Sequence, residues 1–290
     1  MTSKKVLIIL NYNDFDMCNR LLNQTASYKV FYKIILVDNQ SSDDSYKRLK
    51  EAYQKNERIE FIQTSTNKGY ATGNNFGAFY AIRNYTPDIL YIANPDVLFE
   101  EDVVQKMADA MFSRSDAGIV APLVTQGYNI WRLPGFWGVI ESLFLVTFSL
   151  DKVRIRRKLE RLDGIQEAGV VEGSFFAVSS EAFEKTGGFD ERTFLYYEEN
   201  ILGQKMRQKG YQSYVLPQER YEHLHSQSIR KRYKSKARAF KQFYPSVQVY
   251  LKHYIDATPV QLWIFKIAFQ LAYWERKVYD IVYGFKGLRN

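Results

Sequence analysis

Short apolar runs alternate along the chain with stretches of helical length, and this alternation restricts the possible folds more than any other feature. The runs are rich in β-branched residues and typical of buried strands: residues 6–10, 34–37, 59–62, 89–92 and 118–120. The stretches of mixed polarity between them have helical length: residues 14–27, 43–55, 71–84 and 100–113. The pattern predicts an α/β fold in which helices cover both faces of a mainly parallel sheet.

The second half of the chain follows this pattern less regularly. Residues 170–178 predict a strand, residues 180–186 a short helix that ends at two glycines, and residues 214–216 the last strand. Residues 123–169 are interpreted as an insertion. No alternation of strands and helices follows residue 225. We therefore expect one domain over residues 1–228, with halves at about 1–122 and 123–228, and a C-terminal helical extension over residues 229–290.

Polar residues follow three of the predicted strands. Asn11 and Asn13 follow the first strand, Asp38 the second, and Asn94 and Asp96 the fourth. Ligands of open parallel sheets bind beyond the carboxyl ends of the strands, so we expect these side chains to share one binding edge. The first strand is not followed by Gly-x-Gly-x-x-Gly, which argues against a nicotinamide or flavin dinucleotide site.

Asp96 is a candidate metal ligand. It stands in Asn94-Pro95-Asp96, where the proline makes the turn rigid. A carboxylate there can coordinate Mg²⁺ or Mn²⁺ together with the oxygens of a nucleotide diphosphate, which stabilises the leaving group. The alternative is an ordinary turn that caps the helix starting near residue 100.

Two further segments offer polar groups to a nucleotide. Asp38 can accept hydrogen bonds from a nucleobase or a ribose hydroxyl, but Asp-Asn-Gln-Ser is also an ordinary turn sequence. Residues 67–75 contain Asn67, Gly69 and Asn74 and can bring backbone N–H groups close to a phosphate or base. That segment is equally consistent with a glycine-permitted loop that enters a helix.

Two acidic residues, Glu198 and Glu199, stand beside three aromatic rings in residues 194–200. Burial against such rings raises the pKa of a carboxyl group, so one of the two is a candidate base for deprotonating a hydroxyl group. The alternative is a helix N-terminus at which acidic residues complement the helix dipole.

Two histidines, His223 and His225, are the remaining candidate metal ligands. We expect one of them to reach the metal, on the premise that the two side chains diverge in an extended segment. A histidine on the surface without a ligand is the alternative for either position.

Composition and charge exclude several classes of protein. Cys18 is the single cysteine, so an internal disulfide is impossible and the cytoplasm is the default compartment. The apolar run at residues 6–10 is too short for a signal-peptide core or a membrane span. The net charge of +8 belongs to the tail, because residues 226–290 carry 13 Lys or Arg against 3 Asp or Glu.

Six segments, taken in order, resemble family 2 glycosyltransferases of the GT-A type, particularly the rhamnosyltransferase-like branch that builds bacterial surface polysaccharides. The segments are LNYN at 10–13, VDNQSSD at 37–43, NKGYA at 67–71, NPD at 94–96, GGFDE at 187–191 and HLHSQS at 223–228. The resemblance implies a Rossmann-like GT-A sheet. It also implies inverting transfer of a sugar from dTDP-rhamnose or a UDP-sugar to a saccharide acceptor on a lipid carrier, with Mn²⁺ or Mg²⁺.

The resemblance also assigns roles to residues. Asp38 is similar to the family's nucleoside-binding aspartate, and Asp96 to the metal-binding acid of an Asp-x-Asp-type motif whose first acid is here Asn94. The expected donor-binding set is Asn11, Asn13, Asp38, Asn67, Gly69, Asn74, Asn94 and Asp96. The expected metal set is Asp96, His223 and His225.

On the acceptor side, the resemblance implies a base and two binding residues. Glu199 occupies the position of the family's catalytic aspartate, next to Glu198. The following acid of the family segment is replaced by Ile201, so the local hydrogen bonding must differ. Arg132 is similar to the arginine of an Arg-x-x-Pro stretch, and Gly173 to a glycine on the strand that lines the acceptor pocket.

Two other functions fit parts of the sequence. The glutamate base and Ile201 fit a catalytically inactive subunit that binds sugar nucleotides or glycans, which a transfer assay would separate from an enzyme. The basic tail fits a nucleic-acid-binding protein. Since the basic residues lie outside the part that carries the motifs, we expect no nucleic acid partner.

The tail itself predicts attachment to a membrane. Residues 229–241 carry seven basic side chains, and residues 262–285 are rich in aromatic and aliphatic side chains with one narrow polar stripe. This pattern favours an in-plane helix on the anionic inner face of the cell membrane, with the protein cytoplasmic and peripheral. The alternative is a helix packed on the catalytic body or on a second subunit of a homodimer.

Overall fold

The computed structural model describes residues 3–125, 128–145, 162–224 and 235–283. Its strands are β1 Lys5–Asn11, β2 Lys33–Asp38, β3 Ile59–Gln63, β4 Ile89–Ala93, β5 Val97–Leu98, β6 Ala117–Val124, β7 Ile130–Trp131, β8 Gln166–Ala168, β9 Val170–Val171, β10 Phe175–Ser179 and β11 Gln212–His223. Its helices are α1 Phe15–Thr25, α2 Ser45–Tyr53, α3 Tyr70–Tyr85, α4 Glu101–Phe112, α5 Phe136–Ser142, α7 Ser180–Thr186, α8 Glu198–Gln208, α10 Lys236–Lys241, α11 Phe243–His253 and α12 Pro259–Tyr283.

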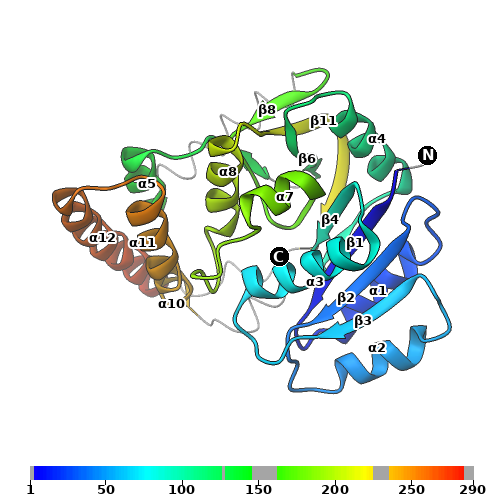
Figure 1. Ribbon diagram of the computed structural model, residues 1–290. Helices are drawn as coiled ribbons and strands as arrows, with labels where there is room; N and C mark the ends of the chain where they lie inside the picture. The colour runs from blue at the N-terminus through cyan, green and yellow to red at the C-terminus, as the bar shows by residue number, and fades with distance from the viewer. Residues whose placement is uncertain (1–2, 126–127, 146–161, 225–234, 284–290) are drawn as a thin grey trace.

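One mixed sheet of nine strands organises the chain (Figure 1). Its order is β3-β2-β1-β4-β10-β6-β11-β5, and β8 pairs with β11 outside this path. Strands β1 to β4 run parallel, as do β6 and β11, whereas β10 is antiparallel to both of its neighbours. The predicted α/β fold with a mainly parallel sheet is confirmed.

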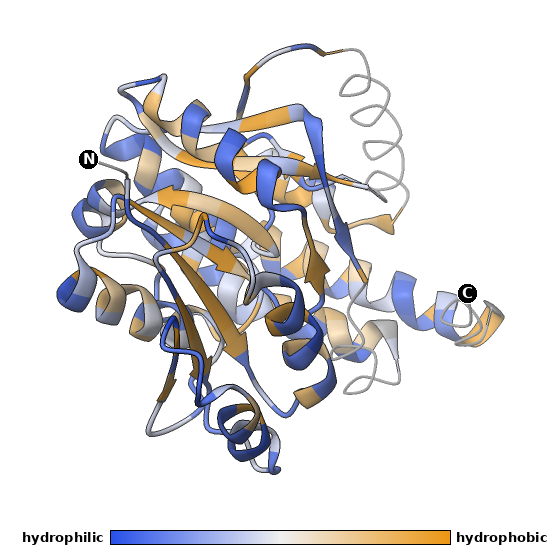
Figure 2. Cartoon of the chain, turned by 90° about the vertical axis from the view of Figure 1, so that its right-hand side faces the viewer, coloured by the Kyte–Doolittle hydropathy of each residue, from blue (hydrophilic) through white to orange (hydrophobic). Residues whose placement is uncertain are grey.

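The side chains of each strand alternate between two cores, one on each face of the sheet. In β1, Leu7 and Ile9 pack with residues of α1, α2 and α4, whereas Val6 and Ile8 pack with residues of α3, α7 and α8. Figure 2 shows the strands of the sheet as mainly apolar. Since both faces are covered, polar ligands can reach the sheet at the ends of its strands.

Two sequence expectations about strands were wrong in detail. Residues 170–178 form two strands, because β9 leaves the main sheet to pair with β7 while β10 enters it between β4 and β6. The last strand is also much longer than residues 214–216, because it continues past irregularities in its pairing with β6 and ends at His223. His223 therefore belongs to the strand and does not follow it.

The C-terminal helices α10, α11 and α12 pack on α5 and α8 through a third core, and α12 is the outermost helix in Figure 1. The buried side chains of this core include Val139, Ile201, Phe240, Val247, Tyr250, Phe265 and Phe269. One face of α12 is thus packed on the body, which was the alternative to a membrane helix. Within the described residues, no helix combines the length and the apolar character needed to cross a bilayer.

Candidate active site

Asp96 and His223 meet at the carboxyl edge of the sheet. Strand β5 begins directly after Asp96 and pairs with the end of β11, so that Val97 lies opposite His223. The backbone N–H of Leu224 also donates to the carbonyl oxygen of Asp96, at 2.8 Å. As a result, Oδ1 of Asp96 lies 3.3 Å from Nε2 of His223, and both side chains are nearly buried.

A second acidic residue, Glu172, approaches the same imidazole from its other nitrogen, and sequence reasoning did not identify it. Its Oε1 lies 3.7 Å from Nδ1 of His223. Burial alone would lower the pKa of His223, but the hydrogen bond to Asp96 and the charges of Asp96 and Glu172 raise it above the ordinary value. Since histidine binds metals through a neutral ring nitrogen, a metal ion would compete with a proton for His223.

Asp96 and His223 together fit a metal ion that is completed by its substrate. Within the described ranges, no three His, Cys, Asp or Glu side chains are grouped closely enough to hold an ion alone. A carboxylate and an imidazole nevertheless suit Mn²⁺, and Mg²⁺ and Mn²⁺ commonly take further ligands from phosphates and water. His225 lies outside the described residues. Whether one of the two histidines reaches the metal therefore stays a prediction, although residues two apart in an extended segment generally share a face.

Glu198 and Glu199 occupy the first two positions of α8 and differ in access to solvent. Glu198 is 2% exposed, and its Oε1 has no hydrogen-bond partner among the described residues. Burial and the neighbouring charge of Glu199 raise the pKa of Glu198 to about 8. Burial, together with the charge of Glu172, raises the pKa of the half-buried Glu199 to about 7. Glu199 is thus the better placed of the two to take a proton from a substrate at neutral pH.

The turn before these carboxylates has an unusual backbone. Tyr196 and Tyr197 have φ angles of 71° and 68°, a conformation that costs a residue with a Cβ roughly 1–2 kcal/mol. The N–H of Tyr70 donates to the carbonyl oxygen of Phe194 at 3.1 Å. At Gly69, whose φ is 100°, a Cβ would lie only 2.1 Å from the same oxygen. The loop expected to bind the donor therefore also packs against the turn at residues 194–197.

Gly173 joins this arrangement through its backbone. The hydroxyl of Tyr70 donates to the carbonyl oxygen of Gly173 at 2.5 Å, and a Cβ at Gly173 would lie 3.1 Å from that hydroxyl. The neighbouring Ser174 accepts from the N–H of Asn94 at 2.8 Å through its carbonyl oxygen. The joint between β9 and β10 therefore holds Glu172, Gly173 and Asn94 beside the pair of Asp96 and His223.

The predicted donor residues at the ends of β1 and β2 are largely enclosed. The Asp38 carboxylate is fully buried and accepts from Asn11 Nδ2 at 2.7 Å, from the backbone N–H of Ser41 at 2.9 Å and from Gln63 Nε2 at 2.8 Å. Asn11 is itself fully buried. Asn13 is exposed, and its Oδ1 accepts from the backbone N–H of Ser42 at 2.7 Å. Donors from the protein therefore already occupy both oxygens of Asp38.

Two other expected donor residues, Asn67 and Asn74, lie in the loop that leads into α3 and in α3 itself. Oδ1 of Asn67 accepts from the N–H of Gly69 at 3.0 Å and from Asn39 Nδ2 at 3.1 Å. Asn74 is 1% exposed and donates from Nδ2 to the carbonyl oxygen of Tyr70 at 3.1 Å. The Asn67 amide therefore shapes the loop, whereas the Asn74 amide bonds within the first turn of α3.

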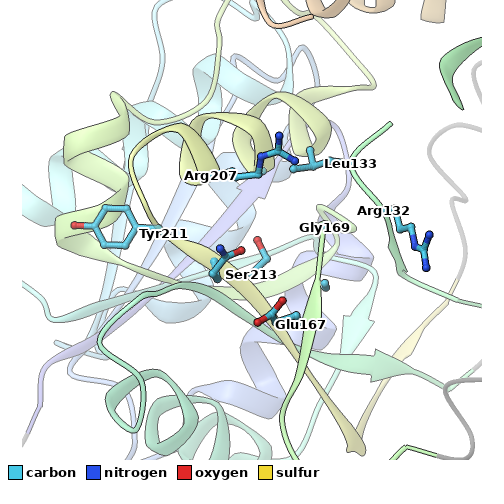
Figure 3. Close-up of a pocket in the computed structure, with 10 residues that line it drawn as sticks. Arg132, Leu133, Glu167, Gly169, Arg207, Tyr211 and Ser213 are labelled. Carbon is cyan, nitrogen blue, oxygen red and sulfur yellow. The ribbon is translucent and has the colours of Figure 1, made fainter. Parts of the chain in front are cut away.

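Arg132 lies apart from this cluster. It lines a pocket of about 370 Å³ with Arg207 of α8 and Gly169, near the beginning of β11 (Figure 3). His223 ends the same strand, so the pocket lies toward the opposite end of β11 from the carboxylate cluster. The structure thus brings together Asn94, Asp96, Glu172, Gly173, Glu199 and His223, and it does not add Arg132 to them.

Known proteins are similar to this chain in sequence and in fold. Residues 6–187 match the model of the Glycosyl transferase family 2. The N-acetylglucosaminyl-diphospho-decaprenol L-rhamnosyltransferase of Mycobacterium tuberculosis is 27% identical over 198 residues, which are 63% of this chain and 64% of that protein. The chain therefore spans less than two thirds of this relative. Rhamnosyltransferase WbbL of Escherichia coli is 24% identical over 220 residues, covering 73% of this chain and 80% of WbbL.

Solved structures agree in fold. GalNAc-T7 with UDP, GalNAc and Mn²⁺ superposes with a TM-score of 0.61 at 14% identity, covering 87% of this chain and 50% of that one. The mannosyltransferase PcManGT of Pyrobaculum calidifontis, in complex with GDP-Man and Mn²⁺, gives a TM-score of 0.54 at 15% identity, covering 97% and 76%. The sheet therefore has the GT-A fold. With nearly two thirds of its residues matched by the family model, the chain belongs to glycosyl transferase family 2.

Proposed function

We propose that this protein is an inverting glycosyltransferase that moves a sugar from a nucleotide-diphosphate donor to a hydroxyl group of a saccharide acceptor. The observation that carries the proposal is the cluster at the carboxyl edge of the sheet. There the Asp96–His223 pair and the half-buried carboxylate of Glu199 both interact with Glu172. A metal-binding pair and a base with a raised pKa are the two functions that such a transfer needs.

The pair of Asp96 and His223 would hold Mn²⁺ or Mg²⁺ together with the diphosphate of the donor. When bound, the ion neutralises the charge that develops on the departing diphosphate. The Mn²⁺ in the structures of GalNAc-T7 and PcManGT supports a divalent ion but does not distinguish Mn²⁺ from Mg²⁺. Asn94, two residues before Asp96, would face the donor sugar or its diphosphate.

Glu199 would act as the base. Its carboxylate takes the proton of the acceptor hydroxyl while that oxygen attacks the anomeric carbon from the face opposite the diphosphate. The new glycosidic bond forms as the bond to the diphosphate breaks, so the anomeric configuration is inverted. Glu198 is buried and protonated near neutral pH, and it would support Glu199 without contacting the acceptor.

The expected donor is dTDP-rhamnose or a UDP-sugar, with its nucleoside at the ends of β1 and β2. Asn13 is exposed there, and Asp38 would become available when Gln63 gives way to the nucleobase. The names of the relatives support a rhamnosyl donor and, for the mycobacterial protein, an acceptor on a lipid carrier. We place the distal part of a lipid-linked surface saccharide at the pocket of Arg132.

An acceptor on a lipid carrier would bring the enzyme to the inner face of the cell membrane, and α12 has a surface suited to it. The apolar side chains on its outer face are between 41% and 79% exposed: Val260, Trp263, Ile267, Leu271, Trp274, Val278, Ile281 and Val282. They recur every three or four residues, opposite the buried Phe265 and Phe269, and the exposed Lys266 and Lys277 flank them. We propose that this outer face of α12 rests on anionic lipid, because exposed tryptophans with flanking lysines suit the membrane interface.

Replacement of Asp96 tests the metal pair. Asp96→Ala should abolish transfer and the metal-dependent part of nucleotide binding, whereas Asp102→Ala, an exposed acid on α4, should change neither. Isothermal titration of UDP and dTDP with Mn²⁺, Mg²⁺ or chelator, alongside a transfer assay, measures both effects. Equal nucleotide affinity and activity in chelator and in Mn²⁺ would overturn the metal proposal. Tight donor binding without transfer to any acceptor would instead favour the inactive binding subunit.

A further inference from the structure

The placement of Glu199 depends on the turn at residues 194–197. Tyr196 and Tyr197 adopt the left-handed φ angles of 71° and 68° immediately before α8 begins at Glu198. Their backbone torsions set the direction in which the first turn of α8 leaves the loop. Large aromatic residues rarely adopt this conformation, so surrounding contacts must maintain it.

Helix α11 supplies those contacts to three successive residues of the turn. The hydroxyl of Ser246 donates to the carbonyl oxygen of Leu195 at 3.0 Å. The ring of Tyr196 stacks on Phe243, with centroids 3.9 Å apart and planes inclined by 7°. Tyr197 is buried, and its ring lies 5.5 Å from that of Tyr250.

Helix α11 is itself fixed from behind by the other C-terminal helices. Val247 and Leu251 are fully buried, and the ring of Tyr244 stacks on Phe265 of α12 at 5.4 Å. In α10, Phe240 stacks on Phe269 of α12 at 4.4 Å. Packing against α10 and α12 therefore holds in place the residues of α11 that contact the turn. The family match ends at residue 187, so both the turn and α11 lie beyond it.

We propose that α11 positions the catalytic base, with Phe243 and Ser246 as positioning residues that hold the turn at residues 194–197 in its left-handed conformation. Without the ring stack and the hydrogen bond, the turn relaxes and the carboxylate of Glu199 leaves its place beside Glu172. Asp38 and Asp96 stand on other elements, and the donor side contacts the turn through the loop at residues 67–70, so donor binding should change less than kcat. The role of Glu199 as the base rests on the proposed function, whereas the support of the turn by α11 does not.

Two variants and one conservative replacement test the catalytic consequence in the full-length protein. Phe243→Ala and Ser246→Ala should each lower kcat, by about tenfold and about threefold, while the KM for the donor changes less than about twofold. Phe243→Tyr keeps the stacking ring and should restore kcat. Phe112→Ala removes an exposed phenyl group from α4 and is the matched control, with no expected change. Unchanged kcat in both the Phe243→Ala and Ser246→Ala proteins would overturn the proposal.

Hydrogen exchange tests whether α11 holds the turn at residues 194–197, independently of catalysis. In Phe243→Ala, the amides of residues 194–201 should exchange faster, while those of β1 and β4 keep the protection of the wild type. Faster exchange across the whole chain of Phe243→Ala would show general destabilisation and overturn a specific effect of Phe243 on the turn. In that case Ser246→Ala must show faster exchange at residues 194–201 alone for the proposal to stand. If the wild type transfers no sugar but the exchange pattern is as expected, the proposed function fails and the positioning contact remains.

Discussion

At the scale of single residues, the two adjacent glutamates have different environments and so different expected roles. Glu199 is half-buried with its pKa raised to about 7, so it is partly ionised at neutral pH and accessible to a hydroxyl group. Glu198 is enclosed, and its Oε1 finds no partner among the residues that the structure describes. A buried carboxyl group of this kind remains protonated until higher pH.

Replacement of each glutamate by glutamine should separate the two roles. Glu199→Gln should lower kcat by about 10²-fold or more with little change in donor affinity, because a proton acceptor is lost but the shape is kept. In the wild type, kcat should rise with pH through a midpoint at about 7 and level off once Glu199 has lost its proton. Steady-state kinetics from pH 5.5 to 9 would show both effects. An inactive Glu198→Gln beside an active Glu199→Gln would move the base by one residue.

The buried Glu198 should also make stability depend on pH. Burial raises its pKa in the folded state from the ordinary 4.5 to about 8. The stability that the protonated side chain contributes is therefore fully present below about pH 4.5 and is lost as pH rises through about 8. Glu198→Gln keeps a neutral side chain, so its melting temperature should exceed that of the wild type at pH 9 and approach it at pH 5. A gain on the order of 1 kcal/mol corresponds to about 2–4 °C. An advantage that grew toward pH 5 would contradict this assignment.

Sequence reasoning identified Asp96, His223 and Glu199 as candidates because each stands in a recognisable local context, near the end of a strand or the start of a helix. It missed Glu172, because this residue lies at the joint between β9 and β10, and the sequence suggests a single strand there. It also could not foresee that Asp38 accepts a hydrogen bond from Gln63, since that contact depends on the register between β2 and β3.

At the scale of elements, the loop that enters α3 and the turn that enters α8 support each other. Gly69→Ala should disrupt both, because the new Cβ would lie 2.1 Å from the carbonyl oxygen of Phe194 at a φ of 100°. We expect a loss of roughly 2 kcal/mol in unfolding free energy and at least about tenfold in kcat. Gly135→Ala is the matched control, because nothing lies within 4 Å of its added Cβ. Thermal melts and kinetics of the two variants compare them directly, and equal behaviour would refute the coupling.

The strands and helices of the first half were predictable because their apolar periodicity is strong and local. The elements that the sequence did not predict depend on distant partners. β5 and β8 exist as strands because they pair with β11, and β7 because it pairs with β9. The short helices α10 and α11 are likewise fixed by rings from α12.

At the scale of the whole molecule, the C-terminal helices connect the turn at residues 194–197 to the outer surface of the protein. The inner side of this layer contacts the turn before Glu199, and α12 is its outermost helix (Figure 1). Exposed apolar side chains line the outer face of α12. A helix with apolar residues on both faces needs a partner on each. The sequence showed the apolar character of residues 262–285, but only the packing of Phe265 and Phe269 reveals which face stays exposed.

If that exposed face rests on lipid, it should bind vesicles in proportion to their anionic content. The intact protein should co-sediment with phosphatidylglycerol-containing liposomes at low salt, and Trp263→Ser with Trp274→Ser should reduce binding at least about tenfold, since each removes a large interfacial side chain. Phe112→Ser is the control for an exposed aromatic residue elsewhere. Analytical ultracentrifugation tests whether a second copy of the chain covers this face instead of lipid. Such a dimer would be dissociated by the two tryptophan changes. A stable dimer that ignores anionic vesicles would assign the outer face of α12 to self-association and remove the membrane from the proposal.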